Sequence, residues 1–296
     1  MKQVLSFDVD QTLNVAKTPI PPEMAAVLSH CLDHFYICPI SGQKFEQFLV
    51  QIVNPLVAYA AEEELPLLGA EHKDLAQRPG ASSRRAGEAS INATKLIKRL
   101  ENLHLFVAQG TQYYRYQPSS DSYDPADWHQ VYNYPLKDED VVKITTTLQQ
   151  AAEELGFWEA DKLAEGDKII ENRLSQVTFS ALGQTAGTEA KYAWDPDLKK
   201  RQAIVAKCRE KLPDFLYEIG GTTSINVAAP GMNKEFGMAH LLEELHVDKS
   251  DVLYFGDMTQ PGGNDYPVVA MGIDTITVRS HEDTLFALRG ILGILD

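Results

Sequence analysis

The sequence predicts an α/β protein, with a Rossmann-like parallel-sheet core and a smaller α+β cap inserted into it. Residues 4–9 and 252–256 are short, apolar and β-prone, and aspartates stand at the carboxyl end of each run. Buried strands of parallel sheets have this composition. Between them, residues 138–227 follow the order helix, strand, strand, helix, strand, strand. That order is typical of an antiparallel sheet covered by two helices.

The expected domain order follows from this pattern. Residues 1–133 form the first part of the core, 134–229 the cap and 230–296 the second part of the core. A unit inserted between two stretches of a parallel core can close over the strand ends and exclude water.

Within the first part of the core, the helix after the first strand is predicted by two prolines ahead of apolar residues at helical spacing. The further elements expected are a strand at 35–40, a helix from about Lys44, a helix at 93–100 and a strand pair at 105–108 and 112–116. Residues 54–92 are richer in small and charged residues, so we expect an insertion with a helix and an exposed loop. The pair Arg84 and Arg85 is interpreted as part of that solvated loop.

Composition limits the function. The 296-residue chain has a formal net charge of −15, which argues against nucleic acid as a partner. Its three cysteines lack the number and spacing of a disulfide framework or a zinc site. The chain shows no apolar leader and no bilayer-spanning run, so we expect a cytoplasmic protein without membrane contact. A homodimer is an open expectation.

Carboxylates gather where two strands end. Asp8 and Asp10 flank the end of the first strand, and Asp257 follows the late strand. Parallel strands bring their carboxyl ends to one edge of the sheet, where ligands bind. Such oxygens suit Mg²⁺, so the sequence predicts a magnesium site. Read alone, Asp8-Val9-Asp10-Gln11-Thr12 is equally well an aspartate-rich turn.

Four motifs in order resemble the haloacid dehalogenase-like (HAD) superfamily. They are the DxDxT string from Asp8, Ser41 after the second strand, Lys234, and Gly256-Asp257 followed by Asn264-Asp265. The resemblance implies a Mg²⁺-dependent phosphotransferase that forms an aspartyl-phosphate. It implies catalytic roles for Asp8, Asp10, Ser41 and Lys234, and a metal site of Asp8, Asp10, Asp257, Asn264 and Asp265. From local sequence alone, Ser41 could equally be a helix N-cap and Lys234 a surface lysine.

The resemblance narrows to the eukaryotic-type phosphomannomutases in the last third of the chain. Phe255 to Asp265 reads FGDMTQPGGND, and the IGG string at 219–221 and the GMNK string at 231–234 are also similar to segments of that family. The implied substrate is a small sugar phosphate.

Several positions depart from the family. Arg173 matches one of its phosphate-binding arginines, but Gln184 and Lys191 stand where two more are expected. Arginine binds phosphate with paired hydrogen bonds that glutamine and lysine cannot reproduce. Asn226, two residues after Ser224, stands where the family has an aspartate for sugar hydroxyls, and Gln11 where it has glycine.

Three functions follow as alternatives. The intact motifs and the cap favour a phosphomannomutase, which interconverts mannose 1-phosphate and mannose 6-phosphate. The changes at Gln184 and Lys191 favour a sugar-phosphate phosphatase. A non-catalytic binding protein is disfavoured, because it has no need for clustered charge. The expected substrate-binding residues are Arg173, Gln184, Lys191, Ser224 and Asn226.

Overall fold

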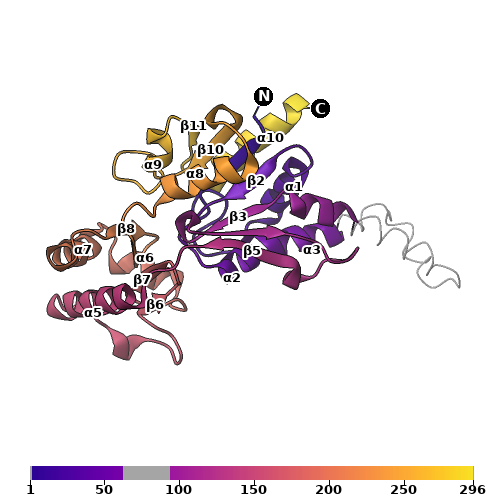
Figure 1. Cartoon of the computed structure of the whole chain (residues 1–296). Coiled ribbons are helices and arrows are strands. Elements are labelled where there is room, and N and C mark those ends of the chain that lie inside the picture. The colour runs from indigo at the N-terminus through magenta and orange to yellow at the C-terminus, as the bar shows by residue number, and fades with distance from the viewer. Residues whose placement is uncertain (1, 63–93, 296) are drawn as a thin grey trace, which may run out of the picture.

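The structure is a computed structural model that describes residues 2–62 and 94–295. Figure 1 shows two units, an α/β core and a smaller cap that follows β5 and precedes α8 in the chain. The predicted fold class, a parallel-sheet core with an inserted α+β unit, is confirmed. The boundaries at 133/134 and 229/230 stay a prediction. In the described ranges, no helix has the length and apolar character needed to cross a membrane.

The centre of the core is a four-stranded parallel sheet in the order β11-β10-β1-β2. Its strands are β1 (Val4–Phe7), β2 (Tyr36–Pro39), β10 (Val252–Gly256) and β11 (Asp274–Thr277). In the register of β1 with β10, Phe7 lies opposite Phe255. The next residues along both strands therefore emerge at the same edge, which brings Asp8 and Asp257 together.

A second, antiparallel sheet extends the core beyond β2. It consists of β3 (His104–Val107), β4 (Gln112–Tyr116) and β5 (Trp128–Asn133), and isolated bridges join Ile37 to Leu103 and Ile40 to Phe106. The predicted strand pair at 105–108 and 112–116 is thus confirmed. The analysis missed β5, whose middle residues are polar and largely exposed.

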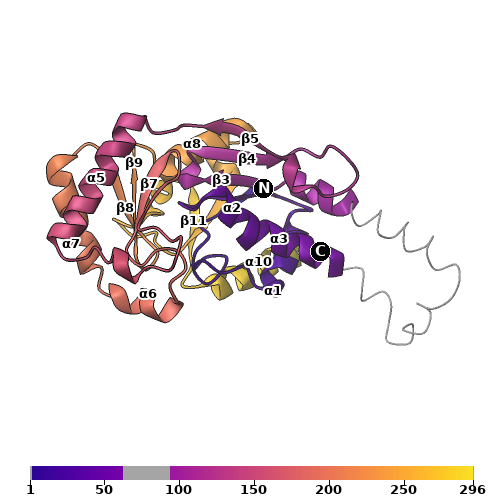
Figure 2. The same ribbon diagram turned by 90° about the horizontal axis from the view of Figure 1, so that it is seen from below.

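Helices cover both faces of the parallel sheet. On one face lie α1 (Pro22–Cys31), α3 (Asn54–Glu62) and α10 (His281–Leu295), as Figure 2 shows. On the other lie α8 (Lys234–Leu245) and α9 (Tyr266–Ala270). Alternation along the strands serves both layers, because Phe7 belongs to the first cluster and Tyr254 to the second.

The segment after β2 only partly follows the prediction. The helix expected near Lys44 begins as α2 (Phe45–Phe48), passes through a π-helical turn (Leu49–Val53) and continues as α3. Residues 54–62 of the expected insertion therefore belong to the helical layer, where Leu56 is buried against α1. The rest of the insertion through residue 92, including Arg84 and Arg85, lies outside the described residues, and a helix covers residues 94–101.

The cap is a four-stranded antiparallel sheet with two long helices. Its elements are α5 (Asp138–Glu154), β6 (Ile170–Asn172), β7 (Gln176–Ser180), α6 (Thr188–Trp194), α7 (Lys199–Lys211), β8 (Leu216–Gly220) and β9 (Ser224–Ala228). The predicted order is observed, with the short α6 in addition. Val177, Phe179 and Ile225 pack under α5 and α7, which lie on the outer side in Figure 2. The opposite, polar face of the sheet is turned towards the core.

Candidate active site

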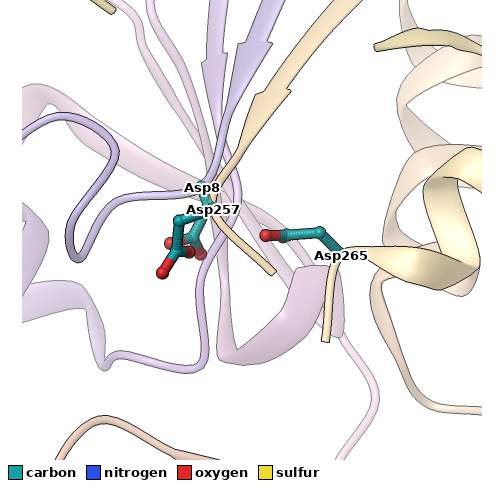
Figure 3. Close-up of side chains that lie close together, drawn as sticks. All are labelled: Asp8, Asp257 and Asp265. Atoms are coloured by element: carbon teal, nitrogen blue, oxygen red, sulfur yellow. The ribbon is translucent and has the colours of Figure 1, made fainter. Parts of the chain in front are cut away.

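Three aspartates meet at the carboxyl edge of the parallel sheet. Asp8 follows β1 and is 4% exposed, Asp257 follows β10, and Asp265 precedes α9. One carboxylate oxygen of each lies within 4.8 Å of the others, and Figure 3 shows Asp265 pointing towards Asp8 and Asp257. The backbone N–H of Asp8 donates to the carbonyl of Phe255 over 2.9 Å, which fixes the start of the loop. Two of the three therefore owe their proximity to the register of β1 and β10.

Lys234 joins this group from the first turn of α8. Asn233 caps that helix by accepting from the backbone N–H groups of Glu235 and Phe236. The Lys234 Nζ donates to Asp8 Oδ1 over 2.5 Å and to Asp265 Oδ1 over 2.6 Å. Although burial alone would lower the pKa of Lys234, the Asp265 and Asp8 carboxylates hold it well above its usual value. A buried, permanently charged ammonium thus lies directly beside Asp8.

Tyr254 completes the network from the middle of β10. Its hydroxyl donates to Asp265 Oδ1 over 2.5 Å and accepts from Lys234 Nζ over 3.1 Å. Burial would raise the pKa of Asp265, but the Lys234 ammonium and these hydrogen bonds hold it below its usual value. Asp265 is therefore an anion whose first task in this structure is to position Lys234.

Asp8 and Asp257 have the opposite electrostatic character. Burial raises the pKa of Asp8 well above its usual value, and burial together with Asp265 raises the pKa of Asp257 to about 6. One ammonium does not offset this concentration of negative charge, so a cation would be stabilised here. The buried Asn264 Oδ1 also lacks a partner within the described residues. Hard oxygen donors of this kind fit Mg²⁺.

Asp10 lies at the rim of the same site. Its Oδ1 accepts from the backbone N–H of Lys17 over 2.8 Å and from Gln43 Nε2 over 2.9 Å. The neighbouring Gln11 has a φ of +68°, a left-handed conformation that a glycine would adopt without strain. Its Nε2 donates to the hydroxyl of Tyr192 on α6 over 3.1 Å, which links the motif loop to the cap.

A cavity of about 760 Å³ lies between this edge and the polar face of the cap sheet. Of the residues expected from the sequence, those lining it are Asp8, Asp10, Ser41, Arg173, Ser224, Asn226, Asp257 and Asn264. Arg173 reaches across it, because its Nη1 donates to the carbonyl of Gly42 over 3.1 Å while Nη2 pairs with Glu171 over 2.8 Å. The cavity thus has a carboxylate end in the core and a cationic side chain from the cap.

Gln184 and Lys191 are placed differently. In the described part of the chain, neither is among the residues that line the cavity. Lys191 Nζ donates to the carbonyl of Gln184 over 2.6 Å, and Gln184 Nε2 donates to Glu171 and Ser180. The two side chains are therefore committed to the cap itself, and their role in binding a phosphate stays a prediction.

The sequence analysis missed four residues of the site: Lys17, Gln109, Glu218 and Tyr254. Burial and the nearby Lys191 lower the pKa of Lys17 to about 8, and its Nζ is buried without a hydrogen-bond partner among the described residues. Gln109 and Glu218 line the cavity together with Lys17. Weak signals existed, because Glu218 and Tyr254 are polar positions inside otherwise apolar strands.

Solved structures with the same arrangement define the class of protein. A haloacid dehalogenase-like hydrolase from Bacteroides thetaiotaomicron aligns with a TM-score of 0.51 and 11% identity, covering 98% of this chain and 100% of that one. IMP-bound Plasmodium falciparum IMP-nucleotidase aligns with a TM-score of 0.60 and 14% identity, covering 99% of this chain and 68% of that one. The chain therefore has the HAD-like fold predicted from its motifs.

Sequence relatives are more specific. Residues 163–294 match the family model of eukaryotic phosphomannomutase. The phosphomannomutase of Schizosaccharomyces pombe is 24% identical over 99% of this chain and 95% of its own length, and that of Spinacia oleracea is 32% identical over 40% and 48%. A probable phosphomannomutase of Caenorhabditis elegans is 23% identical over 100% and 97%. The chain is an enzyme of the HAD phosphomannomutase type.

Proposed function

We propose that this protein is a Mg²⁺-dependent phosphotransferase that moves a phosphoryl group between positions 1 and 6 of a hexose phosphate, with mannose phosphate as the favoured substrate. The observation that carries the proposal is the contact of Asp8 with the Lys234 ammonium at the core end of the closed cavity. A carboxylate held beside a fixed cation, and open to a cavity, is arranged to attack phosphorus.

In the proposed reaction, an Asp8 oxygen forms a bond to phosphorus as the bond to the sugar oxygen breaks. Asp10 gives a proton to that sugar oxygen and takes it back from the hydroxyl that attacks in the return step. Lys234 and the Ser41 hydroxyl stabilise the negative charge on the transferring oxygens, since phosphoryl transfer depends chiefly on positioning and electrostatics. Mg²⁺, when held by Asp8, Asp257 and oxygens of Asp10 and Asn264, would neutralise phosphoryl charge.

A mutase must also keep water out while the sugar phosphate turns around. Three contacts between cap and core support this requirement: Gln11 with Tyr192, Gln109 with Glu218, and Arg173 with the Gly42 carbonyl. Arg173 and Lys17 supply positive charge for the phosphate distant from Asp8.

The second candidate is a sugar-phosphate phosphatase. Its support is the placement of Gln184 and Lys191, whose hydrogen bonds within the cap leave fewer cations for a second phosphate. Weak retention of a bisphosphate would let water reach the aspartyl-phosphate. Solubility in the cytoplasm and a homodimeric state stay predictions that belong to either candidate.

The test follows phosphorus directly. Protein with Mg²⁺ and mannose 1-phosphate is monitored by ³¹P NMR, with and without a hexose bisphosphate primer. A mannose 6-phosphate signal that requires the primer is the expected result, and Asp8→Asn should abolish it. Free phosphate alone would favour the phosphatase. Binding of the sugar phosphate with neither product would support a non-catalytic binding protein instead.

A further inference from the structure

The cavity face of the cap sheet carries one continuous row of polar side chains. In the strand register, Glu171 of β6 lies opposite Thr178 of β7, Thr178 opposite Asn226 of β9, and Asn226 opposite Glu218 of β8. Residues directly opposite one another in a sheet project from the same face. Both ends of the row are therefore carboxylates, with a threonine and an amide between them.

The two carboxylates have different partners. Glu171 is paired with Arg173, which places it on the phosphate-binding side of the cavity. Glu218 instead accepts a hydrogen bond from Gln109 Nε2 over 2.6 Å, and Lys234 and Asp265 are close enough to affect its pKa. Glu218 thus lies on the side of the cavity nearer to the nucleophile.

Gln109 is an unusual partner, because it comes from the core and is held in a strained conformation. It is 3% exposed and has a φ of +63°, and Ala108 before it has a φ of +50°. Strain of this kind clusters at functional sites. The Gln109 Oε1 is buried with no hydrogen-bond partner within the described residues, although the side chain lines the cavity. An orphaned buried acceptor calls for a donor from a ligand.

The space beside this pair is narrow and polar. A Cβ built on Gly42 would come 2.8 Å from Asn226 Nδ2 and 3.2 Å from Gln109 Nε2, so any side chain at position 42 would fill it. Thr178 Oγ1 donates to Asn226 Oδ1 over 2.9 Å, which leaves the Asn226 amide nitrogen directed towards Gly42. Carboxylate and amide groups that converge on a small space recognise hydroxyl or amino groups, whereas a carboxylate repels phosphate.

We propose that Glu218, together with Gln109, binds a hydrogen-bond-donating group on the substrate ring, a hydroxyl or an amine, and thereby sets which hexose phosphate is accepted. This inference rests on the proposed function at the same site. It adds a carboxylate on β8 as a specificity-determining residue, in register with Asn226. Burial raises the pKa of Glu218 to about 7, which is consistent with a side chain that lacks water and awaits a polar ligand.

The test is Glu218→Gln, which keeps the shape of the side chain and an acceptor for Gln109. Steady-state constants are measured with mannose 1-phosphate, its deoxy analogues, glucosamine 6-phosphate and acetyl phosphate, which has no ring. The expected result is a rise of KM for mannose 1-phosphate of about 10-fold, the size of one hydrogen bond to a charged group, with a much smaller rise for acetyl phosphate. Glu218→Asp should recover part of the loss, and Glu210→Gln on the exposed surface of α7 serves as control.

The analogues identify the bound group. A deoxy analogue whose disadvantage disappears in Glu218→Gln marks the hydroxyl, while a larger loss for glucosamine 6-phosphate marks an amine. Equal KM changes for acetyl phosphate and all sugars would overturn the proposal and leave Glu218 as a contact that closes the cap. If the native enzyme turns over acetyl phosphate but no sugar phosphate, the proposed function fails. The role of Glu218 is then decided by calorimetric Kd values for the same sugars, which a specificity residue changes and a closing contact alone does not discriminate.

Discussion

The core edge and the cap face meet at one cavity, but they are built differently. In the core, Asp8, Lys234, Tyr254 and Asp265 are buried, and each contacts at least one of the others. On the cap, Arg173 and Glu218 remain partly exposed to the cavity and hold core groups, a Gly42 carbonyl and Gln109. The chemistry is therefore fixed by a rigid network, whereas recognition depends on contacts that a substrate could replace.

The sharpest way to test this contrast is to remove the nucleophile. Asp8→Asn should lower turnover by at least about 10⁴-fold, because no other carboxylate occupies its position beside Lys234. The variant should still fold, since burial already disfavours the charged form of Asp8. Single-turnover phosphate release and thermal unfolding check the two statements, with Asp121→Asn in an exposed loop as control. Turnover within 10-fold of the native rate would place the nucleophile elsewhere.

Lys234→Met should cost the core network more stability than any change on the cap face. The variant leaves Asp8 and Asp265 buried without their shared ammonium, and breaking a buried ion pair costs about 3–5 kcal/mol. Urea unfolding near neutral pH measures the loss, and Lys168→Met at an exposed position is the matched control. A loss no larger than the control's would mean that the network does not stabilise the core.

Glu218 should report on the cap face through pH. Burial raises its pKa from 4.5 to about 7, so the folded state binds a proton more tightly than the unfolded chain between those values. The stability from this group is present at low pH and is lost as pH rises through about 7. Glu218→Gln should therefore gain stability relative to the native protein between pH 5 and pH 8, by about 1–2 kcal/mol. Urea unfolding at both pH values would contradict this if the gain were larger at pH 5.

The smallest effect is expected at the link between the two regions. Gln11→Gly relieves a left-handed conformation that costs about 1 kcal/mol and removes the hydrogen bond to Tyr192. Stability should change by less than about 1 kcal/mol, while the fraction of phosphoryl groups lost to water rises a few-fold, because the cap closes less firmly. Tyr192→Phe is the control, since it removes the same hydrogen bond and leaves the strain. Equal product ratios in ³¹P NMR for both variants and the native protein would exclude a role in closure.

The sequence predicted the core edge better than the cap face for a physical reason. Asp8 and Asp257 follow strands whose apolar runs are visible in the chain, and parallel pairing aligns their ends without further information. Gln109 and Glu218 were missed because their meeting depends on a left-handed turn and on how the cap sheet is placed against the core. Position along the chain also gave no sign that Lys191 would bond to Gln184.

The order of the strands has a consequence for how the chain folds. β1 lies in the middle of its sheet, yet its neighbour β10 begins at Val252, and Asp8 meets Lys234 across 226 positions of sequence. Contacts of such long range close slowly, while the cap, contiguous from α5 to β9, pairs its strands locally. On the ribosome, the cap can assemble first, and β1 keeps an open edge until the final third emerges. Newly made chains would therefore be most prone to aggregate just before the nucleophile gains its lysine.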